Sequence, residues 1–262
     1  ANSSGASNVA VGYAALSANT TAANNTAVGT GALAANTTGD ANTALGKDAL
    51  DSNTTGTRNV AIGVDALQAN TTADDNVAIG YEALNVNTAA NNTAVGKGSL
   101  AANTTGYENT AVGANSADTT TTGIRNVAVG HNSLEANTTG SSNTALGRSA
   151  LGSNTTADHN VAIGREALVS NTTGTQNVAI GNFSLDANTT ADNNTAVGYA
   201  SLGANTTGTE NVAVGKSALA ANTTGDGNVA LGMVALDANT TTDSNTAIGH
   251  AVLSTATASN NT

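Results

Sequence analysis

The sequence predicts an all-β protein, a parallel β-solenoid of about fifteen 17-residue coils. Three observations favour this fold: a strict repeat along the 262 residues, short β-branched segments that each end at a glycine, and an abundance of Asn, Thr, Gly and Val, which are poor helix formers. No apolar stripe recurs at the three-and-four spacing of a helix. Fifteen coils at ~4.8 Å per step predict a rod roughly 70 Å long.

Each repeat follows the pattern N-[TV]-A-[VIL]-G-x-x-[ASV]-L-x-[small]-N-T-T-[GAT]-x-x, and its places are numbered here as positions 1 to 17. The pattern predicts a single repeat domain over residues 1–262, with a partial coil at 1–7. Full repeats start at residues 8, 25, 42, 59, 76, 92, 109, 126, 143, 160, 177, 194, 211, 228 and 245. The repeat that starts at Asn76 is one residue short, because Asn87-Thr88-Ala89 replaces Asn-Thr-Thr.

Two or three short strands are expected in each coil, the first at positions 2 to 4 and the second in the A-L-x-A stretch at positions 8 to 11. Gly at position 5 ends the first strand in every repeat, and we expect it to have a positive φ or a very close backbone approach. Position 15 accepts Gly, Ala or Thr, so no positive φ is required there. Strand alternation places positions 2 and 4 on one face of the strand and position 3 on the other.

Asparagine marks two corners of each coil. Because stacked coils place each position-1 Asn above the one before, we expect a hydrogen-bonded ladder of side-chain amides. The ladder begins with Asn8, Asn25, Asn42, Asn59, Asn76, Asn92 and Asn109. A second row of asparagines is expected at position 12, at the other corner, and it is interrupted by Thr120 and Ala256.

The alanine at position 3 is the candidate self-association surface. It is invariant, although the opposite face of the strand already carries Thr or Val and then Val, Ile or Leu. A thin coil has one inside, so we expect one of these two faces to pack against another copy of the chain. The candidate row is Ala10, Ala27, Ala44, Ala61, Ala78, Ala94, Ala111, Ala128, Ala145, Ala162, Ala179, Ala196, Ala213, Ala230 and Ala247. The alternative is a monomeric rod in which the alanines line a narrow interior and the valines face outward.

Charge and composition exclude several functions. The formal net charge is −11, from 18 acids and 7 bases, which argues against a nucleic-acid or anionic-membrane partner. No run approaches the ~18 apolar residues of a membrane span. All charged residues, His and Tyr fall at positions 6, 7, 10, 16 or 17, so these five positions are expected to face water.

No catalytic, metal or cofactor site is predicted, and we do not expect an enzyme. His131, His159 and His250 lie in distant repeats, and the Asp74-Asp75 pair has no recurrent nucleophile or His beside it. Two binding functions stay open as alternatives: an ice-binding solenoid that uses the Thr rows of the Asn-Thr-Thr corners, and a calcium-binding β-roll with an isolated site at Asp74-Asp75. Asn-Thr-Thr is also a glycosylation acceptor sequence, present twelve times.

The blocks at Asn8–Gly12 (NVAVG) and Asn25–Gly29 (NTAVG) resemble the head repeats of trimeric autotransporter adhesins of the YadA type and related repeats of phage and bacterial tail fibres. The resemblance covers residues 1–262, although the heads of that family usually have a shorter coil. It implies a left-handed parallel β-roll, a homotrimer packed side by side, and display outside the cell or on its surface. It also implies adhesion to a host-surface or matrix receptor. The chain starts and stops inside a repeat, so we expect a piece of a longer fibre or rods that stack end to end.

Overall fold

A computed structural model describes residues 2–254 and 258–262, and within them every regular element is a β-strand. The all-β class predicted from the sequence is confirmed. Each repeat contributes one three-residue strand at positions 2 to 4, so the expected first strand is confirmed in all fifteen repeats. The expected lapse of the second Asn row at Ala256 lies outside the described residues.

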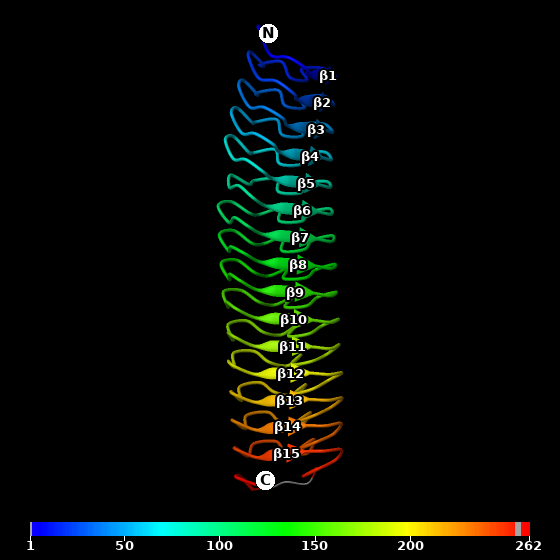
Figure 1. Cartoon of the computed structure of the whole chain (residues 1–262), viewed down its shortest axis with the longest axis vertical. Coiled ribbons are helices and arrows are strands. Elements are labelled where there is room, and N and C mark those ends of the chain that lie inside the picture. The colour runs from blue at the N-terminus through cyan, green and yellow to red at the C-terminus, as the bar shows by residue number, and fades with distance from the viewer. Residues whose placement is uncertain (1, 255–257) are drawn as a thin grey trace. The chain divides into compact units, whose positions relative to one another are not determined.

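The chain divides into two compact units, Ala1–Asn126 and Val127–Thr262. In the first unit each strand pairs in parallel with the next in sequence order, and Figure 1 shows one strand per coil. These strands are β1 (Val9–Val11), β2 (Thr26–Val28), β3 (Thr43–Leu45), β4 (Val60–Ile62), β5 (Val77–Ile79), β6 (Thr93–Val95) and β7 (Thr110–Val112).

The second unit repeats the arrangement, again with parallel pairing between consecutive strands. Its strands are β8 (Val127–Val129), β9 (Thr144–Leu146), β10 (Val161–Ile163), β11 (Val178–Ile180), β12 (Thr195–Val197), β13 (Val212–Val214), β14 (Val229–Leu231) and β15 (Thr246–Ile248). In both units like positions pair, as Ala44 does with Ala61, so each unit is a parallel β-solenoid.

The prediction of a second strand at positions 8 to 11 is wrong. These residues form turns, because the backbone is left-handed at positions 7 and 9, as at Asp65 (φ 58°) and Leu67 (φ 52°). The stretch still bonds between coils: the Leu67 N–H donates to the Ala83 carbonyl at 2.9 Å. A left-handed L-residue costs about 1–2 kcal/mol, so coil stacking and Leu burial must outweigh that strain.

The glycine at position 5 has the positive φ that the sequence predicts. Gly63 has φ +133°, and a Cβ added there would lie 2.4 Å from the carbonyl oxygen of Gly80 in the next coil. Gly56, at position 15, has no positive φ, as expected from the Ala and Thr found at that place in other repeats. Position 5 is therefore glycine both for its conformation and for the close approach of the next coil.

The interior of each coil is narrow and built mostly from small side chains. Alanine at position 3, Ala or Ser at position 8 and Leu at position 9 supply the apolar part, and Leu67 and Leu168 are fully buried. Ser99, at position 8, donates its hydroxyl to the Ala111 carbonyl at 3.0 Å, so a polar atom inside the coil is satisfied. Among the described residues, the only large apolar side chain in the interior is Leu, one per coil except where Ala117 replaces it.

The short repeat keeps its strand in register and changes its corner. Val77 pairs with Thr93, an offset of 16 residues instead of 17. In the shortened corner the Asn87 amide donates to the Ala89 carbonyl two residues on, at 2.6 Å, instead of three residues on. As a result the Oδ1 of Asn70, in the coil before, is buried without a hydrogen-bond partner. The one-residue deletion therefore changes the corner and leaves the strand pairing unchanged.

Candidate functional site

The asparagines at position 1 form one continuous hydrogen-bonded row in the first unit. The Asn42 Oδ1 accepts the backbone N–H of Asn59 at 2.9 Å, and the Asn59 Oδ1 accepts that of Asn76 at 3.0 Å. The same bond joins Asn8 to Asn25, Asn25 to Asn42, Asn76 to Asn92 and Asn92 to Asn109. The donors in this row are therefore mainly backbone N–H groups, whereas the sequence predicted hydrogen bonds from one side-chain amide to the next. Amide contacts add to it in places, as from Asn59 to Asn42 at 3.2 Å.

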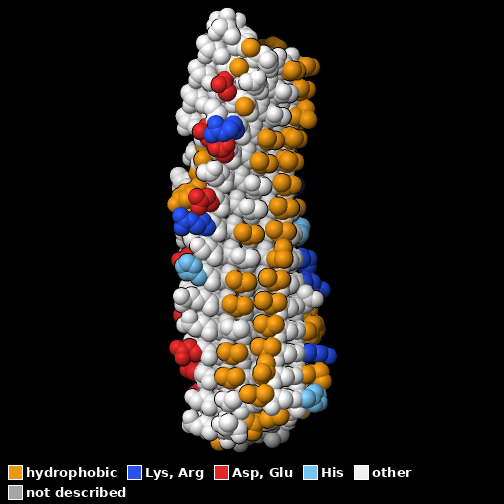
Figure 2. Space-filling view, in the orientation of Figure 1, with side chains coloured by type: hydrophobic (Ala, Val, Ile, Leu, Met, Phe, Trp, Pro, Cys, Tyr) orange, Lys and Arg blue, Asp and Glu red, His pale blue; other side chains and the backbone are white. Residues whose placement is uncertain are grey.

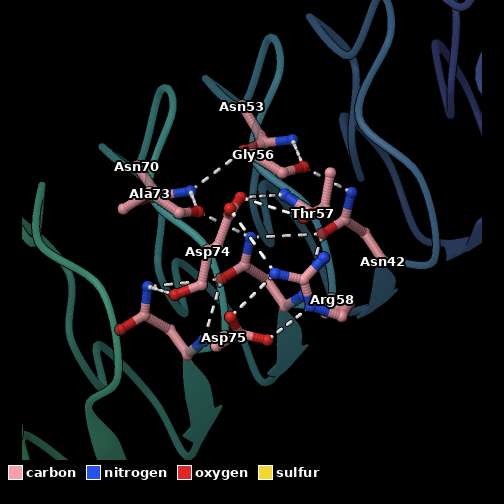
Figure 3. Close-up of polar contacts among 11 residues, drawn as sticks. Asn42, Asn53, Gly56, Thr57, Arg58, Asn70, Ala73, Asp74 and Asp75 are labelled. Carbon is pink, nitrogen blue, oxygen red and sulfur yellow. Dashed lines mark hydrogen bonds and ion pairs between the residues drawn. The ribbon is translucent and has the colours of Figure 1, made fainter.

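The second Asn row, at position 12, is bonded side chain to side chain. The Asn53 amide donates to the Asn36 Oδ1 at 2.9 Å and to the Gly56 carbonyl at 3.0 Å. The Gly56 carbonyl also accepts the Asn42 amide at 2.8 Å, so the two rows meet at position 15 (Figure 3). Where Thr120 replaces Asn, the Oδ1 of Asn103 is buried without a partner. Both rows are buried and hold neighbouring coils together.

The prediction that the alanine row forms a self-association surface is wrong. Within a single chain the alanines at position 3 from Ala27 to Ala247 are at most 1% exposed, and only Ala10, in the first strand, is exposed. They point into the coil, where Leu at position 9 leaves room for no more than a methyl group. The alternative orientation holds, with alanines inside and the Thr, Val, Ile and Leu of positions 2 and 4 outside.

Positions 2 and 4 therefore form the outward side of the strands, called here the strand face. Position 4 is Val, Ile or Leu in every repeat and keeps much of its surface in water, with Leu45 47% and Leu146 43% exposed. Position 2 alternates irregularly between Val and Thr. No charged residue occurs at either position, and Figure 2 shows the two columns of hydrophobic side chains. Exposed aliphatic rows of this kind mark interaction surfaces.

The variable positions 6, 7, 10, 16 and 17 face water as predicted, since among their described residues only Gly31 is buried. In the first unit the two carboxylates of the calcium alternative bind their own chain. The Arg58 Nε lies 2.6 Å from the Asp75 Oδ1, and the Asp74 Oδ1 accepts the Thr57 N–H at 2.7 Å (Figure 3). The hydrogen bond from Arg58 lowers the pKa of Asp75. These two carboxylates therefore link neighbouring coils through hydrogen bonds and an ion pair.

The histidines do not come together in a site. His131 and His250 lie at position 6 and His159 at position 17, all exposed. Within residues 2–254 and 258–262 no group of three His, Asp or Glu is placed to hold a metal ion, and no pocket is found. The same residues include no helix long and apolar enough to cross a membrane.

The two threonine rows of the corners differ in their contacts. At position 13 the hydroxyl donates to the carbonyl of the next coil, as from Thr37 to Thr54 at 3.0 Å. At position 14 the side chains of Thr38 and Thr55 are exposed. The position-13 hydroxyls therefore form hydrogen bonds between neighbouring coils, and the position-14 side chains are exposed to water.

The fold and these rows define the chain as a β-solenoid repeat protein. No family model, no curated protein and no solved structure matches it.

Proposed function

We propose that the chain is a structural and adhesive fibre segment that acts outside the cell or on its surface and associates with copies of itself through the strand face. In this proposal three left-handed copies pack side by side, segments join end to end, and the water-facing positions meet a host-surface or matrix receptor. No reaction is assigned to it. The observation that supports the proposal is the aliphatic side chain at position 4 of every repeat, which is never buried and is exposed in about half of the repeats.

Two physical arguments support the strand face as the contact. Covering the exposed part of one Val, Ile or Leu stabilises by up to about 1 kcal/mol, and a gain of this kind recurs in each coil. A position that only met water would also accept polar residues, as position 6 does with Tyr13, Lys47 and His131. Position 4 accepts none. A contact with another molecule explains this restriction without using the buried alanines.

The mass in solution tests the proposal. Light scattering is expected to give a multiple of the 25.2 kDa chain mass. Introducing charge on the strand face, with Ile163→Lys and Ile180→Lys, is expected to reduce the mass to that of one chain while the circular dichroism spectrum is kept. The control is Thr173→Lys with Thr190→Lys, at position 14, which leaves the strand face intact. An unmodified chain that is folded and has a mass of 25.2 kDa at all concentrations refutes self-association.

Ice binding is the second candidate, because exposed threonines recur at position 14 in nearly every coil, with Ala89 as an exception. It predicts thermal hysteresis, and this hysteresis is lost when Thr173 and Thr190 are replaced by Lys but kept in the strand-face variant. The calcium alternative predicts a melting temperature that rises with calcium, and the Asp74→Asn, Asp75→Asn variant removes that rise. A positive result in either assay displaces the structural proposal.

A further inference from the structure

Acceptor sequences for Asn-linked sugars occur at several positions of the coil. Such a sequence is Asn, any residue but Pro, and then Ser or Thr. Twelve are the Asn-Thr-Thr motifs of position 12, and one begins at Asn182, at position 6. Three more begin at position 17, where Asn24, Asn91 and Asn193 each precede the Asn of position 1 and the Thr of position 2. The structure separates these sequences by whether a transferase can reach both the Asn amide and the hydroxyl.

The asparagines of the twelve Asn-Thr-Thr motifs are closed to a transferase, because each of them is fully buried. Their amide hydrogens are also in use. The Asn70 Nδ2 donates to the Asn53 Oδ1 at 2.9 Å and to the Ala73 carbonyl at 3.1 Å, and Asn188 makes the same two kinds of bond (Figure 3). A sugar on this nitrogen would replace one hydrogen and lie between coils about 4.8 Å apart. The position-12 row cannot carry sugar and keep its coils stacked.

The acceptor at Asn182 is closed for the opposite reason. Asn182 itself is exposed, although its Oδ1 accepts the Arg165 N–H at 2.9 Å. Ser184, two residues on, is fully buried and donates its hydroxyl to the Gly181 carbonyl at 2.9 Å. Since the acceptor sequence requires a hydroxyl at this place, a transferase must reach it. In the folded coil it cannot.

The position-17 acceptors are open at both places. Asn24, Asn91 and Asn193 are exposed, and within the described part of the chain no hydrogen bond holds their side chains. The Thr two residues on, as at Thr195, lies at position 2 on the outward side of the strand and is half-buried. Only the position-1 Asn between them points inside. The amide nitrogen and the hydroxyl therefore lie on the outside of the same coil.

Two further acceptors lie in the first and the last described coils. Asn2 and Ser4 are both exposed, and so are Asn260 and Thr262. The Asn2 amide donates one hydrogen bond, to the Gly5 carbonyl at 2.7 Å. Together with the three position-17 asparagines, these two are called here the open acceptors: Asn2, Asn24, Asn91, Asn193 and Asn260.

We propose that the folded chain takes Asn-linked sugars at the open acceptors alone, and that the Asn-Thr-Thr motifs must stay unmodified for the coils to stack. In the transfer, the Asn Nδ2 attacks the anomeric carbon of a sugar diphosphate. A C–N bond forms, the anomeric C–O bond breaks, the diphosphate leaves, and the Nδ2 gives up one proton. Sugar is therefore compatible with the fold when it is added after folding, whereas addition to position 12 during synthesis prevents folding. This inference does not depend on self-association or on a receptor.

Mapping the modified sites of the folded chain tests the assignment. The chain is incubated with a soluble Asn-glucosyltransferase and UDP-glucose, at a concentration where it does not associate, and its peptides are analysed by mass spectrometry. We expect glucose at the open acceptors and none at position 12 or Asn182. Glucose on a position-12 Asn, in a chain that keeps its circular dichroism spectrum, overturns the inference. So does a lack of glucose at Asn24, Asn91 and Asn193 when the same enzyme modifies the chain during its synthesis.

A new acceptor at position 17 tests the rule within one coil. His159 lies at position 17 with φ 60°, and Val161 lies at position 2. The double variant His159→Asn, Val161→Thr uses residue types that other repeats carry at these positions, so we expect it to fold. It should gain one glucose per chain relative to the unmodified sequence. The control is His159→Asn alone, which lacks the Thr and should gain none. A double variant that folds and gains no glucose contradicts the rule.

Adding the transferase during cell-free synthesis tests the order of events. With enzyme and UDP-glucose present from the start, we expect glucose at position 12 and a chain without the circular dichroism spectrum of the fold. The matched control replaces the position-14 Thr by Ala in all twelve motifs, which removes the acceptors and keeps the buried asparagines. Ala89 shows that this position accepts Ala, so the control should fold under the same conditions. A chain that carries glucose throughout position 12 and still folds overturns the inference.

Discussion

Replacing one asparagine of the position-1 row tests whether that row holds the coils together. In Asn59→Ala the Asn76 backbone N–H loses its acceptor at 3.0 Å inside the coil. A buried donor left unsatisfied costs about 1–3 kcal/mol. The Asn59 amide also bonds the Ala73 carbonyl at 2.8 Å, but that oxygen keeps the Asn70 amide at 3.1 Å. With about 1 kcal/mol for the lost amide bonds, we expect Asn59→Ala to destabilise the chain by about 2–4 kcal/mol.

The matched control is Asn53→Ala, at position 12, with the same loss of volume at another buried corner. The Asn53 Oδ1 accepts only the Asn70 amide, and the Gly56 carbonyl keeps the Asn42 amide when Asn53 is removed. The Asn36 Oδ1 loses the Asn53 amide, but an oxygen of this row already lacks a partner at Asn70. No backbone donor is orphaned, so we expect a loss of about 1–2 kcal/mol. Urea unfolding followed by circular dichroism, at a concentration where the chain does not associate, gives both values. A loss at Asn53 equal to or larger than that at Asn59 refutes the reasoning.

Three further predictions use the same unfolding assay. Leu168→Ala empties the one large apolar site of its coil and should destabilise by about 2–5 kcal/mol; a loss below 1 kcal/mol contradicts a packed interior. Gly63→Ala, at φ +133° and against the Gly80 carbonyl, should cost at least about 2 kcal/mol, and a neutral result argues against the close approach of the coils. Burial raises the pKa of Asp186, so its ionised form is unfavourable above that pKa and the penalty disappears as the pH falls through it. Asp186→Asn should therefore stabilise slightly at pH 7, by less than ~1 kcal/mol after solvent screening, with no gain near pH 3.

Much of the coil was predictable from the repeat. Invariance at positions 1, 3 and 5 located the buried Asn, the strand and the glycine with positive φ, because these places are constrained by stacking. Charged residues marked the five positions that meet water. The left-handed residues were not predicted, since Leu67 and Arg58 (φ 57°) belong to residue types that rarely adopt this conformation. A signal existed at positions 7 and 17, where Asn, Asp, Ser and Gly are frequent, but none existed for the Leu at position 9.

The orientation of the strand was the point at which the candidate site failed. Both of its faces are apolar and nearly invariant, so alternation alone does not say which one is inside. Size decides it, since the Leu at position 9 occupies most of the coil and a methyl group such as that of Ala61 fills what remains. Both faces are constrained, as the sequence indicates, but the expected contact with another copy was assigned to the row that is buried inside the coil.

The shortened corner between Asn87 and Asn91 shows that chain length and strand register are independent in this architecture. A deletion there leaves Val77 opposite Thr93 and disturbs only a few amide bonds. Corners of this kind are suitable sites for inserting foreign peptides or labels, because the change affects only nearby amide hydrogen bonds and the strands of the neighbouring coils keep their register. By the same reasoning, adding or removing a whole repeat at a corner would leave the hydrogen bonds within each remaining layer unchanged.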